Sequence, residues 1–80
     1  MKTYFINTTE NDKILAYSRK NNNEEIIVLL NMSKQNVTFN INENLNNKYI
    51  NIFDDKTYNL TNNISLEKSG YLVLVKQYMI

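Results

Sequence analysis

The chain contains an uninterrupted apolar run, residues 26–30 (Ile-Ile-Val-Leu-Leu), between two polar turns. A short run of this kind, rich in β-branched residues and bounded by turn residues, is typical of a strand that is buried on both faces. We therefore predict a central strand over residues 25–32. An unpaired charge is costly in a small core, so Val28→Asp is expected to unfold the domain.

The other segments also alternate short apolar stretches with turns. Residues 36–41 place Val37, Phe39 and Ile41 on one face, which is the period-2 pattern of a strand with one wet side. Tyr71–Lys76 is apolar on both faces and predicts a second central strand. No segment has helical periodicity, and further strands are expected at residues 3–7, 13–19, 48–53, 57–60 and 64–66. This pattern predicts an all-β fold, a small antiparallel β-sandwich of seven to eight strands, with residues 1–80 as a single domain.

Two local details of this fold are predicted. Alternation over residues 48–53 puts Tyr49, Asn51 and Phe53 on the same face. The turn at residues 67–70 ends in Gly70, the only glycine of the chain, which is expected to adopt a positive φ. Residues 42–47 are expected to be a polar connection with at most one helical turn.

Composition excludes several kinds of site. The chain has 80 residues, no cysteine and no histidine, so it lacks disulfides, thiolate metal ligands and the commonest general base. We expect no cofactor and no metal. A net charge of +1 gives no electrostatic reason to expect nucleic acid or an anionic membrane as a partner. No apolar run approaches the ~20 residues that span a bilayer. The N-terminus turns polar too early for a signal peptide, so the cytoplasm is the default location unless a signal was lost with a missing part.

Several short motifs follow one another in a recognisable order. Leu-Ala-Tyr-Ser-Arg at residues 15–19 ends one strand, and the next strand closes on Leu-Leu-Asn-Met-Ser at residues 29–33. Phe39-Asn40-Ile41 comes after this Asn-x-Ser corner, and Tyr-Ile-Asn-Ile-Phe-Asp-Asp, Ile-Ser-Leu and Gly-Tyr-Leu-Val-Leu-Val come later. This ordered set resembles the C-terminal domain of the alpha-amylase family of glycoside hydrolases, over residues 4–76. Within the family, it is similar to oligosaccharide-cleaving members such as oligo-glucosidases and neopullulanase-like enzymes.

The resemblance implies a non-catalytic β-sandwich that packs against a catalytic (β/α)₈ barrel and stabilises it. The family's retaining mechanism uses an Asp and a Glu at the ends of barrel strands, and this chain contains none of that barrel. No catalytic residue can therefore be assigned here, and the chain alone is not expected to be an enzyme. The parent enzyme would be a retaining α-glucan hydrolase.

Two residues are candidates for contact with sugar or with the barrel. Tyr58 lies in a short polar strand and could stack on a sugar ring, although tyrosines more often pack at a core or an edge. Arg19 is the only arginine and could form an interface ion pair or end a strand in solvent. Asp54 and Asp55 are adjacent carboxylates, but a hairpin turn accounts for them, and neither a metal site nor an acid pair is expected there.

Three roles remain open from the sequence. The first is a structural accessory domain of an amylase-type enzyme, which predicts neither activity nor strong sugar binding by the chain alone. The second is an α-glucan carbohydrate-binding module, which would use exposed aromatic residues; the absence of tryptophan counts against it. The third is an independent protein-interaction β-domain whose open strand edges bind a partner.

Overall fold

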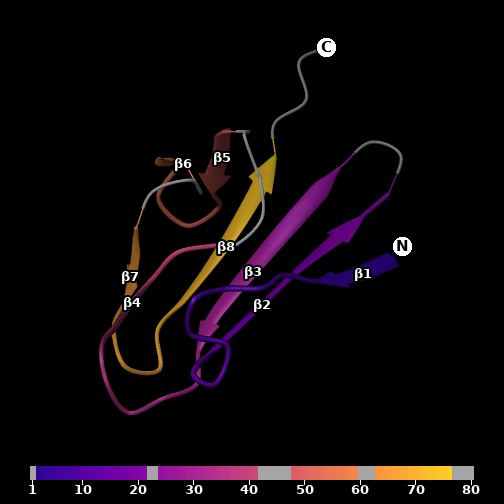
Figure 1. The fold of residues 1–80 in the computed structure, drawn as a ribbon. Helices are drawn as coiled ribbons and strands as arrows, with labels where there is room; N and C mark the ends of the chain where they lie inside the picture. Colours follow the sequence, from indigo (N-terminus) through magenta and orange to yellow (C-terminus); the bar gives the residue numbers. More distant parts are fainter. Residues whose placement is uncertain (1, 22–23, 42–47, 60–62, 77–80) are drawn as a thin grey trace.

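The computed structural model describes residues 2–21, 24–41, 48–59 and 63–76, and these form antiparallel strands and turns (Figure 1). The predicted all-β fold is confirmed, with strands at nearly the residues expected. The predicted connection at residues 42–47 lies outside the described residues. None of the described segments forms a helix that could span a bilayer. The strands are β1 (Lys2–Phe5), β2 (Ile14–Lys20), β3 (Glu25–Asn31), β4 (Val37–Phe39), β5 (Lys48–Asn51), β6 (Thr57–Asn59), β7 (Ile64–Leu66) and β8 (Tyr71–Lys76).

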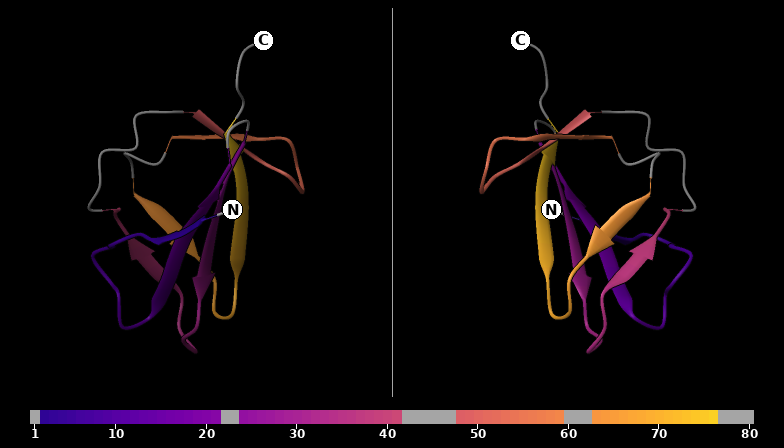
Figure 2. Two further views of the ribbon diagram at one scale, coloured as in Figure 1. Left: turned by 90° about the vertical axis from the view of Figure 1, so that its right-hand side faces the viewer. Right: turned by 90° about the vertical axis from the view of Figure 1, so that its left-hand side faces the viewer.

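The strands form a small β-sandwich of two unequal sheets. The large sheet has the order β1-β2-β3-β8-β5-β6, and the small sheet contains β4 and β7. Both predicted central strands are inner strands, because β3 lies between β2 and β8, and β8 lies between β3 and β5. Figure 2 shows β4 and β7 leaning over one side of the large sheet. We call that side the inner face of the large sheet and the opposite side its outer face.

The core lies between the inner face and the small sheet. Ile27 and Leu29 of β3 point into it and have no exposed surface. Val28 lies between them in sequence, so it points to the outer face and is only half-buried. The expectation that Val28 is a core residue is therefore wrong, although its strand is central. The core consists of Ile6, Ile14, Ala16, Ile27, Leu29, Val37, Phe39, Tyr49, Ile64, Leu66 and Leu74.

The predicted positive φ of Gly70 is wrong. The preceding residue, Ser69, adopts the left-handed conformation with a φ of 56°, and no described glycine has a positive φ. Gly70 is needed for space instead. A Cβ atom at this position would lie 2.8 Å from the carbonyl oxygen of Glu67, which is closer than real Cβ atoms approach. The turn therefore uses serine for its unusual backbone angle and glycine for a close approach of two backbone segments.

Phe53 also departs from the predicted alternation. Tyr49 and Asn51 are buried on the inner face, as expected, but β5 ends at Asn51. The side-chain oxygen of Asn51 accepts a hydrogen bond from the Phe53 N–H at 3.0 Å, which turns the chain at this point. Phe53 thereby leaves the inner face and contacts Tyr71 by its ring.

Asn31 connects the two sheets at the end of β3. Its amide nitrogen donates to the carbonyl oxygens of Gln35, Leu66 and Glu67 at 2.8, 3.2 and 3.0 Å. Its oxygen accepts from the backbone N–H and the hydroxyl of Ser33 at 2.9 and 2.7 Å. The side chain is buried, so these contacts satisfy polar groups that water does not reach. The Asn-x-Ser triplet at this corner therefore has a structural role.

A second buried polar group is found at the other end of β3. The Tyr49 hydroxyl donates to Glu25 Oε1 at 2.7 Å, and Lys20 Nζ lies 3.2 Å from Glu25 Oε2. Tyr49 and Glu25 are both buried, and the Lys20 side chain is about half exposed. The carboxylate of Glu25 is thus held by one neutral and one charged donor, which compensates for its burial.

Candidate partner-binding face

The outer face of the large sheet is an apolar surface built from alternate residues of the central strands. Pairing across the sheet aligns Phe5, Tyr17, Val28 and Val73 in one row. A second row contains Leu15, Leu30 and Tyr71. In the middle of this face the side chains are half-buried, and these residues are Leu15, Tyr17, Ile26, Val28, Leu30, Ile50, Val73 and Val75.

Exposed aromatic rings lie at two opposite margins of the outer face. Phe5 is 74% exposed, Phe53 63% and Tyr71 56%. Phe53 and Tyr71 meet edge to face with ring centroids 5.6 Å apart, and Phe5 and Tyr17 do so at 6.5 Å. A contiguous apolar surface with exposed aromatic margins is typical of a surface that binds another protein or domain. Rings at steep angles to each other do not form the flat platform on which successive sugar rings stack.

The two candidates from the sequence lie at different places. Arg19 is exposed on β2 and belongs to the outer face, in a row with Thr3, Ile26, Val75 and Ile50. Tyr58 pairs with Tyr49 on the opposite side of the sheet, is partly buried and packs against the core. The fold therefore brings Arg19, but not Tyr58, next to the apolar surface.

The described residues contain no arrangement of side chains typical of catalysis. Asp54 and Asp55 lie in the turn after β5, where Asp54 Oδ1 accepts the Lys56 N–H at 2.9 Å and Asp55 has a φ of 60°. This confirms that they are turn residues. The buried carboxylate of Glu25 is occupied by Tyr49 and Lys20. No group of three or more acidic, histidine or cysteine residues in the described part of the chain could hold a metal ion.

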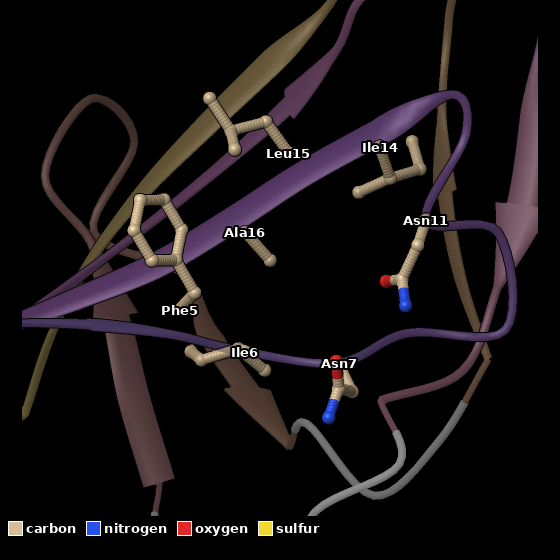
Figure 3. Close-up of a pocket in the computed structure, with 7 residues that line it drawn as sticks. All are labelled: Phe5, Ile6, Asn7, Asn11, Ile14, Leu15 and Ala16. Carbon is tan, nitrogen blue, oxygen red and sulfur yellow. The ribbon is translucent and has the colours of Figure 1, made fainter.

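A small recess opens where β1 separates from β2 (Figure 3). Its volume is about 170 Å³, and no titratable side chain lines it. Phe5 and Leu15 at its margin belong to the outer face, while Ile6, Ile14 and Ala16 belong to the core. Asn7 and Asn11 complete the lining. A volume of this order can accept a ring the size of benzene, so the recess is suited to one apolar side chain.

Comparison with known families decides what kind of domain this is. The model of the family described as "Maltogenic Amylase, C-terminal domain" matches residues 5–73, which is most of the chain. The chain belongs to this family. The resemblance inferred from the sequence motifs is confirmed, and the chain is a C-terminal domain of the alpha-amylase family.

A solved structure supports the fold of this maltogenic amylase C-terminal domain. The noncanonic maltogenic alpha-amylase AmyB from Thermotoga neapolitana matches with a TM-score of 0.63 and 23% sequence identity. The match covers 96% of this chain but 21% of AmyB, so the chain spans about a fifth of that protein's length. A search of curated proteins gives no significant match.

Sequence reasoning missed the exposed margin of this maltogenic amylase C-terminal domain. The sequence predicts a central strand for Tyr71, with packing at a core or an edge favoured over sugar stacking, and it predicts the same face for Phe53 as for Tyr49. The sequence does contain a signal for this surface. In β2, β3 and β8 the alternate residues that face the core are largely apolar, and the alternate residues that face away from it are largely apolar as well. Such a doubly apolar strand needs a cover on both sides.

Proposed function

We propose that this chain is a non-catalytic accessory domain of an alpha-amylase-type glycoside hydrolase, and that its outer face packs against the catalytic (β/α)₈ barrel and stabilises it. The observation that supports this most directly is the apolar outer face. Of the described elements, β4 and β7 cover the inner face, and no strand covers the outer one (Figure 2). Family membership and the much greater length of AmyB agree with a neighbouring domain as the cover.

The helices on the outside of a barrel present convex ridges of side chains, and a sheet face can accommodate them. In this arrangement Val28 and Val73 would lie at the centre of the contact, where exclusion of water is most complete. The recess beside Phe5 and Leu15 would receive one apolar side chain of the barrel. We further infer that catalysis belongs to the barrel, through the two carboxylates of a retaining α-glucan hydrolase.

The experiment compares lysine substitutions on the two sides of the domain. In an assembly of this chain with the amylase barrel of its source organism, Val28→Lys should raise the dissociation constant by about 30-fold or more. This corresponds to the ~2 kcal/mol typical of a central interface residue. The lysine stem can lie along the sheet, so the fold should persist. Sedimentation over a dilution series measures the dissociation constant, and circular dichroism checks the fold.

The matched control is Thr38→Lys, which places the same charge on an exposed residue of β4, in the small sheet. It should change the dissociation constant by no more than about twofold. The same two substitutions can be compared in the isolated chain, which should self-associate through its outer face at high concentration. Val28→Lys should weaken this self-association, and Thr38→Lys should not. Equal effects of both lysines on docking would show that the outer face is not the contact surface.

An α-glucan-binding role for Tyr58 stays a prediction from the sequence, and its partly buried position gives it no further support. If Tyr58 did bind sugar, Tyr58→Ala would abolish the retardation of the chain in gels containing starch or pullulan. We expect unretarded migration of both proteins, with Tyr58→Phe as the control that keeps the ring. Incubation with maltooligosaccharides should release no new reducing ends, and release by the chain alone would contradict the accessory role.

A further inference from the structure

We infer that Arg19 forms an ion pair with a carboxylate on the surface of the docked barrel, and that this pair fixes the orientation of the two domains. The inference rests on the proposed function, because it assigns a chemistry to the partner of the same face. It identifies that partner as an apolar helical surface that carries an Asp or a Glu near its margin.

Arg19 is the charged residue among the outer-face positions of β1, β2, β3 and β8, the strands that carry the apolar rows. Its neighbours across the sheet are Thr3 on β1 and Ile26 on β3, neither of which can neutralise a guanidinium group. Its side chain is exposed and makes no hydrogen bond or ion pair with the described part of the chain. Among the described residues, the position therefore offers a positive charge without a partner, beside the apolar rows of the outer face.

The adjacent lysine provides an internal comparison. Lys20 points to the inner side of the sheet, where its ammonium group lies 3.2 Å from Glu25 Oε2 and 5.6 Å from the centre of the Tyr4 ring. The two consecutive cations thus differ in their partners. The charge of Lys20 is compensated within the chain, whereas that of Arg19 is compensated by no described residue.

A docked barrel would remove much of the water around Arg19. A charge that loses its hydration without gaining a partner is strongly unfavourable, so the surface that covers it must supply an acceptor. A carboxylate fits best, because the planar guanidinium group can bind both of its oxygens in parallel. An amide or hydroxyl acceptor would leave the charge uncompensated.

The position of Arg19 also explains how the ion pair would fix the orientation of the docked barrel. Apolar contact is non-directional, so the flat centre of the outer face allows the partner to slide and rotate. Arg19 lies off this centre, one residue before the end of β2 at Lys20. One charged contact away from the centre excludes rotated arrangements, since these would leave both charges unpaired.

The test uses the assembly of this chain with the amylase barrel of its source organism, with sedimentation as the readout. Arg19→Glu should raise the dissociation constant by about 30-fold or more, and Arg19→Met by about tenfold, because each leaves the barrel carboxylate without its partner. Arg19→Lys should retain part of the affinity. The control is Lys34→Glu, the same charge reversal in the exposed turn after β3, which should have an effect within about twofold.

Two further measurements separate an ion pair from general packing. Added sodium chloride should weaken the wild-type assembly more than the Arg19→Met assembly, because the variant has no pair to screen. Reversing the charge of one acidic residue of the barrel to lysine should restore binding of Arg19→Glu. Equal affinity of wild type and Arg19→Met, or failure of every acidic position to restore binding, would overturn the inference. If Val28→Lys still weakens docking in that case, the proposed function stands without the ion pair. If Val28→Lys has no effect either, both fail.

Discussion

Leu29→Asp should leave the chain unfolded under conditions in which the wild type is folded. Leu29 has no exposed surface and lies on β3, between β2 and β8, so a carboxylate at this position has neither water nor a partner. Burying an unpaired polar or charged group costs several kcal/mol. The total stability of an 80-residue domain is about 4–12 kcal/mol, at roughly 0.05–0.15 kcal/mol per residue. Loss of the far-ultraviolet circular dichroism of the sheet measures the effect.

The control for Leu29→Asp is the same substitution one residue earlier. Val28 points to the outer face and is half-buried, so the carboxylate of Val28→Asp can reach water in the monomeric chain. We expect a folded protein that is less stable by about 1 kcal/mol, the range of strand propensities at partly exposed positions. Similar urea-unfolding midpoints for the two variants would contradict the assignment of the faces.

Asn31→Ala should destabilise the chain by about 2–4 kcal/mol. Alanine removes one amide that bonds three backbone carbonyls and accepts two hydrogen bonds from Ser33. Several backbone groups then lose their partner in a buried place, and each such loss costs about 1–3 kcal/mol where water cannot enter. Thermal unfolding followed by circular dichroism gives the change in stability.

Two variants make this test specific. Asn31→Asp keeps the shape but turns an oxygen towards the carbonyls of Gln35, Leu66 and Glu67, so it should be as harmful as alanine. Asn21→Ala removes an asparagine whose oxygen accepts the Glu24 N–H in an exposed turn, and should cost about 1 kcal/mol or less. A mild effect of Asn31→Asp would mean that the amide donor is unimportant.

The positions of the strands along the chain were predictable because local pattern determines them. The apolar run at residues 26–30 and the one in β8 predicted the two central strands, and strict alternation predicted which residues of β4 face the core. The end of β5 was not predictable in this way. A side-chain hydrogen bond from Asn51 to the Phe53 N–H interrupts the alternation there, and nothing in the pattern of apolar residues encodes it.

The candidate site was predicted less well than the fold. Arg19 could be singled out as the only arginine, but the sequence does not show which face of the sheet it lies on. Both sets of alternate residues in its part of the sheet are largely apolar, so either set could have formed the core. Tyr58 was expected to be exposed because its strand is polar. It is instead partly buried, because pairing with β5 brings it over the core beside Tyr49. Burial of this kind depends on tertiary neighbours, which local pattern does not reveal.

The polar residues at both ends of β3 have a consequence for strand register. A shift of the strand by one residue turns every side chain to the opposite face of the sheet. In most sheets such a shift is unfavourable, because it moves apolar side chains into water and polar side chains into the core. In β3 both faces are apolar from Ile26 to Leu30, so hydrophobicity alone distinguishes the two registers poorly. Glu25 and Asn31 do distinguish them, because either shift would separate Glu25 from Tyr49 and Asn31 from the carbonyls of the small sheet. Two buried polar side chains thus set the alignment of a strand whose apolar residues would tolerate a slip.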